Sequence, residues 1–230
     1  MPTLQARTNA KLPTLKSAGL RLLQIYSELA KNYEHLLGEL LEGQPPRQWE
    51  HYPHDDAMDT SSGYQWFYHS HSPEDRPGSS EHGHIHLFAR RSLWSRRLQS
   101  HAEAEFQSIC GSTKVQTHTR HLLAIGLSAK GVPISLFTVN SWVTGDLMLS
   151  QQLTLELLAA IRLDTGHPNV DAVLESVIQL CWPEIQELMA QRDTRLASYP
   201  GVHKLRSKKL ELLSELSIDL NEKLKRLFEI

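Results

Sequence analysis

Two short segments in which polar and apolar residues alternate, about 63–71 and 83–90, carry the strongest structural signal in this sequence. They read GYQWFYHSH and, with one preceding histidine, HGHIHLFAR. Successive side chains of a β-strand point to opposite faces, so residues two apart share a face. The connecting sequence SPEDRPGSSE holds two prolines and a glycine, which is typical of a turn or an extended loop. The pattern predicts an antiparallel hairpin.

One register of this hairpin sorts its residues by chemistry. It pairs His71 with His82, His69 with His84, Phe67 with His86, Tyr68 with Ile85 and Trp66 with Leu87. One face is then aromatic and aliphatic, fit for a core, while the other face gathers imidazoles. A slip of one residue would mix the two faces and destroy both patterns at once. We therefore predict this register.

Imidazoles gathered on one face of a sheet could bind a metal ion. Directly opposed residues have Cβ atoms about 5 Å apart, which suits nitrogens that lie about 2.1 Å from a shared ion. Neutral imidazole is a good ligand for zinc, copper, iron and nickel, so a divalent metal is the expected cofactor. The candidate ligands are His69, His71, His82, His84 and His86. A solvated polar face is the alternative interpretation.

Carboxylates near these histidines could complete a ligand set or act as a general base. Glu81 precedes the second strand, and Asp55 and Asp56 lie in an irregular stretch before the first strand. With such groups a metal-dependent hydrolase or a non-haem iron oxygenase fits best. A non-catalytic metal-binding or structural protein stays open as an alternative.

Four other histidines are individually weaker candidates. His51 and His54 lie in the irregular stretch, and His118 and His121 lie at the start of a third predicted strand, from which they could reach the site. The sequence NSWVTGD, residues 140–146, is predicted to be a loop or a turn that caps the next helix.

The whole chain predicts one α+β domain, 1–230, built on a small antiparallel sheet. Its parts are an N-terminal helix at about 15–42, a histidine-rich sheet core at about 51–145 and a C-terminal helical part at about 149–228. Two hairpins, about 63–90 and 119–140, form the sheet, and Lys130-Gly131 marks the turn of the second. A break is expected near Pro183.

Composition excludes several classes of partner. A formal net charge of −2 gives no basic excess for binding nucleic acid or an anionic membrane, and a small-molecule substrate stays open as a partner. No secretory signal and no apolar run of membrane-spanning length is present. Cys110 and Cys181 are expected to be buried free thiols, and these features together predict a cytoplasmic protein.

Two short motifs resemble known families. HGHIHLF, residues 82–88, resembles the signature of the histidine-triad nucleotide hydrolases and transferases, which implies an α+β fold and His84 as the nucleophile. In that resemblance His82 and His86 would orient the phosphate and the leaving group. His69-Ser70-His71 followed by Glu74 resembles part of the cupin metal motif and implies similar metal chemistry.

Several longer phrases together resemble an uncharacterised bacterial family described only as a domain of unknown function. The resemblance covers most of residues 51–220 and rests on HYPHDD, SGYQWFYHSHS, EHGHIHLFAR, HLLAIGLSAKGVPISLFTVNSWVTG and LELLSELSIDL. It implies a single domain of bacterial origin and no particular reaction.

Overall fold

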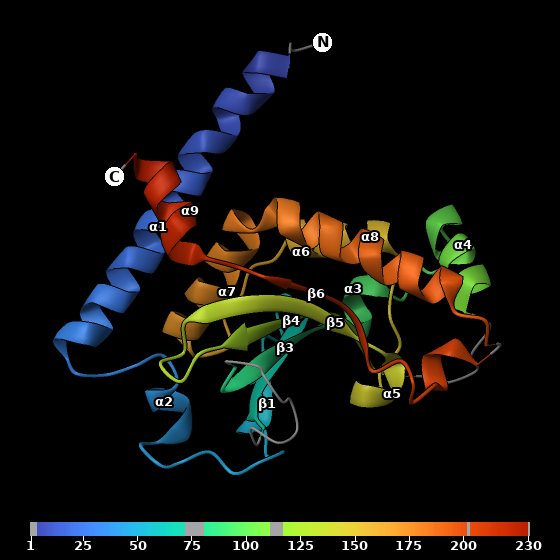
Figure 1. Ribbon diagram of the computed structural model, residues 1–230, viewed down its shortest axis with the longest axis horizontal. Helices are drawn as coiled ribbons and strands as arrows, with labels where there is room; N and C mark the ends of the chain where they lie inside the picture. Colours follow the sequence, from blue (N-terminus) through green and yellow to red (C-terminus); the bar gives the residue numbers. More distant parts are fainter. Residues whose placement is uncertain (1–3, 72–80, 111–116, 202, 230) are drawn as a thin grey trace.

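The protein is an α+β domain built on one antiparallel sheet of six strands. The structure, a computed structural model, describes residues 4–71, 81–110, 117–201 and 203–229. Each strand lies beside its neighbour in sequence, in the order β1-β2-β3-β4-β5-β6 (Figure 1). The strands are β1 (Tyr52–Met58), β2 (Tyr64–Ser70), β3 (Gly83–Arg90), β4 (Thr119–Leu127), β5 (Pro133–Val139) and β6 (Leu212–Ser217).

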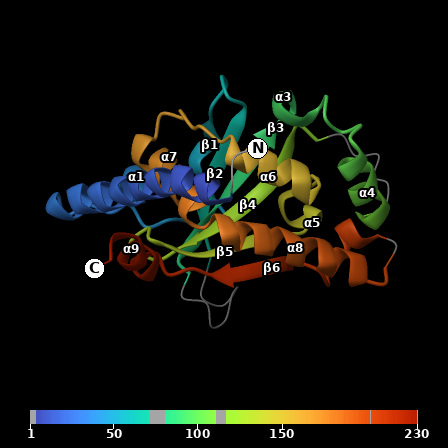
Figure 2. The ribbon, with the colours of Figure 1, turned by 90° about the horizontal axis from the view of Figure 1, so that it is seen from above.

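A layer of helices covers one face of this sheet. The longer ones are α1 (Leu4–Lys31), α4 (His101–Cys110), α6 (Gln151–Ala159), α7 (Pro168–Leu180), α8 (Trp182–Ser198) and α9 (Leu220–Phe228). Helix α8 runs along β5 and β6, while α1 lies beside α7 and α9 (Figure 2). Short helices complete the chain: α2 (Gly38–Leu41), α3 (Arg91–Trp94), α5 (Ser141–Thr144) and η1 (Lys204–Arg206).

The main hydrophobic core lies between the sheet and these helices. Ile85, Leu87 and Ala89 of β3 are fully buried there and belong to one apolar cluster with residues of α7. Each large apolar side chain buried in this way contributes about 1.5–3 kcal/mol to folding. The indole Nε1 of Trp66 donates a hydrogen bond of 2.9 Å to Asp171 Oδ1 on α7, so the polar atom of this buried ring is satisfied.

The predicted hairpin register is confirmed for the paired residues. Strand β2 pairs with β3 in the order Trp66↔Leu87, Phe67↔His86, Tyr68↔Ile85 and His69↔His84. The second hairpin, β4–β5, turns at Gly131, whose φ of +73° is a conformation that glycine adopts without strain. The connection predicted for residues 72–80 lies outside the described residues.

The predicted C-terminal helical part, about 149–228, is wrong in one segment near its end. Residues Leu212–Ser217 form β6, which pairs antiparallel with β5, and the α-helix that follows covers Leu220–Phe228. The leucines of this segment fit a helical period, but pairing satisfies the backbone groups along the outer edge of β5. The backbone hydrogen bonds gained by this pairing outweigh the local preference for a helix.

The predicted helix at 15–42 is also wrong at its end. Helix α1 ends at Lys31, because Tyr33 adopts a left-handed conformation with a φ of 58°. The amide of Glu34 then donates to the carbonyl of Leu29, and that of Tyr33 donates to Ala30, which closes the helix in a Schellman-type turn. The irregular stretch predicted before the first hairpin contains a further strand, β1, at the sheet edge.

Three smaller expectations agree with the fold. The break near Pro183 is present, because α7 ends at Leu180 and α8 begins at Trp182. Cys110 and Cys181 are free and buried. Within the described residues, no helix combines the length and the apolar character needed to span a bilayer.

Candidate metal centre

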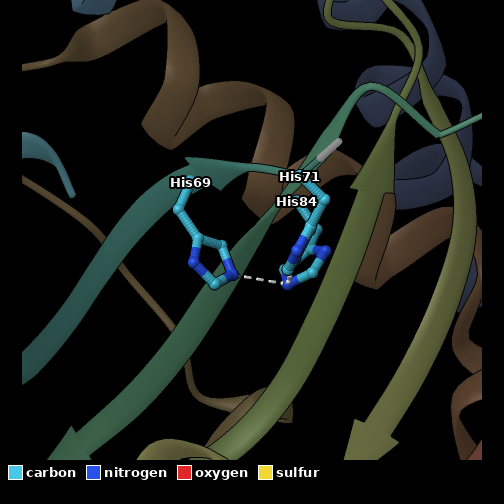
Figure 3. A group of neighbouring side chains, drawn as sticks. All are labelled: His69, His71 and His84. Carbon is cyan, nitrogen blue, oxygen red and sulfur yellow. Dashed lines mark hydrogen bonds between the residues drawn. The ribbon is translucent and has the colours of Figure 1, made fainter. Parts of the chain in front are cut away.

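Three histidines from the β2–β3 hairpin converge on the sheet face opposite the helices. His69 is on β2, His71 directly follows it, and His84 is on β3 (Figure 3). One ring nitrogen from each lies within 4.8 Å of the others. Nε2 of His84 is 2.7 Å from Nε2 of His69 and 3.4 Å from Nε2 of His71. Two nitrogens bound about 2.1 Å from one ion lie about 3.0–3.4 Å apart, so the spacing is close to that of a ligand set.

A buried carboxylate fixes the orientation and tautomer of His84. Glu81 Oε1 lies 2.6 Å from Nδ1 of His84, and both side chains are almost fully buried. The hydroxyl of Ser135 donates to the other oxygen of Glu81 over 3.1 Å. We assign the proton of His84 to Nδ1, because a carboxylate only accepts hydrogen bonds. Nε2 therefore presents a lone pair to the histidine cluster.

This lone pair has more neighbours than hydrogen bonding can satisfy. Nε2 of His84 lies 3.0 Å from Nε2 of His86, in addition to the contacts with His69 and His71. A neutral imidazole nitrogen with one lone pair accepts one hydrogen bond along that direction. Three ring nitrogens therefore compete for one acceptor. A cation resolves the competition, because each neutral ring can then direct a lone pair at the same ion.

The surroundings keep several of these rings neutral. Burial lowers the pKa of His69 to about 3, and the nearby rings of His71 and His51 add to this effect. Burial also holds the pKa of His86 well below its ordinary value, with His84 the next contributor. Imidazole binds metals in its neutral form, so the site is prepared for a cation at neutral pH.

A glycine makes room for Glu81 beneath the cluster. A Cβ on Gly126 of β4 would lie 2.2 Å from Glu81 Oε2 and 2.1 Å from the hydroxyl oxygen of Ser135. The space that this glycine leaves is therefore occupied by the carboxylate that holds His84.

An irregularity in strand pairing brings a fifth imidazole to this face. The β3–β4 register shifts between Leu87 and Phe88, so that Phe88 lies opposite His121. Nε2 of His121 is 3.0 Å from Nδ1 of His86, and burial lowers the pKa of His121 to about 3. Simple alternation from Leu123 would have directed His121 into the helical core. Alternation along β4 therefore could not have placed His121 on this face.

The other predicted residues fall into three places. His82 lies before β3, and its Nδ1 is 2.8 Å from the hydroxyl of Tyr68, away from the histidine cluster. The side chain of Asp55 is 94% exposed and pairs with the equally exposed His54. Asp56 instead lines the same cavity as the cluster, and its two carboxylate oxygens contact His51 and Gln65.

A cavity of about 490 Å³ adjoins the cluster, a volume within the range of small-molecule sites. His69, His71, His84 and His86 line it, together with the aromatic rings of Phe67, Phe88 and Phe137. Trp49, which is 59% exposed, lies edge-on to His71 with ring centroids 4.5 Å apart. The histidines are therefore accessible to a ligand held in this cavity.

The fold and site define an α+β protein whose sheet carries a buried histidine cluster that could hold a metal ion. The chain belongs to the family described as Domain of unknown function (DUF6969), which matches residues 16–218. No curated protein and no solved structure matches the chain. The resemblance of residues 82–88 to the histidine-triad enzymes finds no support in these comparisons.

Proposed function

We propose that His69, His71 and His84 bind one divalent transition-metal ion, with zinc, iron, copper and nickel as candidates. The proposal rests above all on the convergence of three imidazole nitrogens on Nε2 of His84, which hydrogen bonding alone cannot satisfy. Glu81 supports it, because metal-bound histidines usually donate their second N–H to a carboxylate or carbonyl. His86, whose Nε2 lies 3.0 Å from Nε2 of His84, lies beside these three ligands.

We further propose that the protein is an enzyme that uses this metal on a small molecule in the cavity. Three protein ligands with an open side toward a cavity are typical of catalytic sites, whereas structural zinc sites are closed by four protein ligands. An ion held there would polarise a substrate carbonyl or activate a water molecule. These features favour a catalytic role over a purely structural one.

A hydrolytic reaction has a candidate base beside the cluster. Asp56 Oδ1 lies 2.9 Å from Nδ1 of His51, so His51 can donate from Nδ1 and keep Nε2 as a proton acceptor. The His51 ring stacks on Phe67 with centroids 3.6 Å apart, and its centroid is 6.2 Å from that of His69. A non-haem iron oxygenase is the second candidate, because an all-imidazole set also suits iron.

The experiment that tests the metal site compares His84→Ala with His54→Ala. Each variant removes one imidazole, but His54 is 99% exposed and lies outside the cluster. We expect about one metal ion per chain in the wild type and in His54→Ala by plasma mass spectrometry after equilibrium dialysis. Loss of one of three ligands should weaken binding by at least about 100-fold in His84→Ala.

The identity of the bound metal then separates the two reaction classes. Zinc as the preferred ion favours the hydrolase, whereas a redox-active iron favours the oxygenase. The metal proposal fails if the wild type binds none of zinc, iron, copper and nickel above the level of a protein without a histidine cluster. It also fails if a folded His84→Ala variant, checked by circular dichroism, binds as tightly as the wild type.

A further inference from the structure

The cavity beside the histidines extends along the sheet and changes character along its length. At one end are His69, His71 and His84, at the point where β2 ends and β3 begins. Thr119, at the first position of β4, also lines the cavity and lies opposite Arg90, the last residue of β3. Arg90 lies six positions after His84 along β3, which corresponds to about 20 Å of strand. The cavity is therefore elongated.

The middle of the cavity is aromatic. Phe67 and Phe88 stack with ring centroids 5.4 Å apart and an interplanar angle of 25°. Phe137 of β5 is edge-on to His84, with centroids 4.8 Å apart. All three phenylalanines line the cavity, which suits an apolar or aromatic ligand body.

The end of the cavity far from the metal ligands is acidic. Asp146, which follows the short helix α5, accepts a hydrogen bond of 2.6 Å from the hydroxyl of Thr119. Asp146 and Glu211 line the cavity with Asp56, and none of the described lining residues is a lysine or an arginine. Arg120, whose positive charge acts on Asp146, has its guanidinium stacked on Trp94 and hydrogen-bonded to Thr117.

The charge of Asp146 is therefore only partly compensated by the protein. Burial raises the pKa of this carboxyl above its ordinary value, despite the hydrogen bond from Thr119 and the charge of Arg120. Burial deprives the Asp146 carboxylate of favourable interactions with water. A ligand cation beside Asp146 would replace these interactions, whereas a ligand anion would be repelled.

We infer that this cavity takes an elongated small molecule with an apolar or aromatic body and a terminal ammonium group. The ammonium group lies against Asp146, the body lies against the rings of Phe67, Phe88 and Phe137, and the opposite end reaches the histidines. The inference rests on the proposed function in that this opposite end would be the reacting end. It names the substrate class for that site and excludes phosphorylated and carboxylate-terminated compounds of the same shape.

The test uses three probes of nearly equal shape that differ in their terminal group. These are 4-phenylbutylamine, 4-phenylbutan-1-ol and 4-phenylbutanoate, which end in a cation, a neutral hydroxyl and an anion at neutral pH. Their dissociation constants are measured by titration calorimetry on the full-length, metal-free protein. We expect the amine to bind about tenfold more tightly than the alcohol, and the carboxylate to bind most weakly.

Two variants locate the discriminating charge. Asp146→Asn preserves shape and removes the charge at the acidic end, while Asp55→Asn removes an exposed charge outside the cavity. Asp146→Asn should weaken amine binding about tenfold and leave alcohol binding unchanged, and Asp55→Asn should change neither. The inference is overturned if no probe binds, if the carboxylate binds as tightly as the amine, or if Asp146→Asn weakens all three probes equally.

Failure here is distinguishable from failure of the metal proposal. Probe binding is measured without metal, and metal content is measured without a probe. Asp146→Asn should hold as much metal as the wild type, because Asp146 lies at the end of the cavity remote from the three ligands. Amine selectivity in a protein that binds no metal would sustain this inference and refute the proposed function.

Discussion

The two faces of β3 are equally buried but differ in chemistry. Ile85, Leu87 and Ala89 face the helices and are 0% exposed, while His84 and His86 on the other face are 3% and 1% exposed. Burial of the apolar face stabilises the fold, because hydrocarbon leaves water. Burial of the imidazoles lowers the pKa of His86 and so opposes its protonation. One face of β3 thus stabilises the fold, while the other face contributes histidines to the candidate metal site.

The largest expected difference between the two faces is in how acid affects their contribution to stability. His69 and His121 have pKa values of about 3 in the fold, against an ordinary value of 6.5. Below pH 6.5 the unfolded chain takes up protons that the folded protein does not bind until the pH is near 3. Stability present above pH 6.5 is therefore lost as pH falls through this window, by about 1.4 kcal/mol per pH unit for each group.

For the two groups together, the loss is about 4 kcal/mol at pH 5. Urea unfolding of the metal-free protein at pH 7.5 and pH 5 measures it. Replacing one titrating ring, as in His69→Gln, should reduce the pH dependence by about one proton. An equal free energy of unfolding at the two pH values in the wild type would contradict the prediction.

Adjacent alanine substitutions test the two faces directly. Leu87→Ala removes a fully buried side chain from the helical core and should lower the free energy of unfolding by about 3 kcal/mol. His86→Ala removes an equally buried ring, but that ring lines a cavity. Water from the cavity can therefore fill the space that the ring leaves. We expect a cost of about 1 kcal/mol or less for His86→Ala in the metal-free protein.

The measurement is urea unfolding of both metal-free variants at pH 7.5, with metal binding as a second readout. Leu87→Ala should retain the metal affinity of the wild type at temperatures where it is folded. If His86→Ala destabilises the protein as much as Leu87→Ala, the histidine face is a structural core and the distinction between the faces is wrong.

The paired strands were predictable because two independent patterns agreed. Alternation placed Trp66 and Leu87 on one face and His69 and His84 on the other, and only one register preserved both. His82 shows the limit of this logic, since it precedes the strand and contacts Tyr68 rather than the cluster. Alternation describes a residue only while the backbone remains extended.

Other features of the fold and of the site could not be predicted, because they depend on contacts that the local sequence does not encode. Strand β6 forms because the edge of β5 is available, although its leucines also fit a helix. His121 joins the histidine face through a register shift in β4, which alternation cannot anticipate. Glu81 could be identified as a candidate from its position, but its support of His84 required knowledge of where Gly126 leaves space.

The smallest predicted effect concerns the support beneath the metal ligands. Gly126→Ala places a methyl group where the Glu81 carboxylate and the Ser135 hydroxyl now lie, so Glu81 must move away from His84. Supporting groups of this kind typically change metal affinity by 10–100-fold, and we expect about tenfold weaker binding. Competition with a chromophoric chelator measures the affinity, and Gly145→Ala offers a control.

Gly145 is exposed and has open space around its Cβ position, although its φ of 75° makes any substitution there mildly strained. Gly145→Ala should therefore lower stability slightly and leave metal affinity unchanged. Gly126→Ala should weaken metal binding in addition to the cost of fitting a methyl group against Glu81 and Ser135. Weaker metal binding in Gly126→Ala alone would separate support of the ligand from a general loss of stability. Unchanged metal affinity in Gly126→Ala would show that the carboxylate of Glu81 contributes nothing to the binding of the ion, and that the histidine face holds its ligands by strand geometry alone.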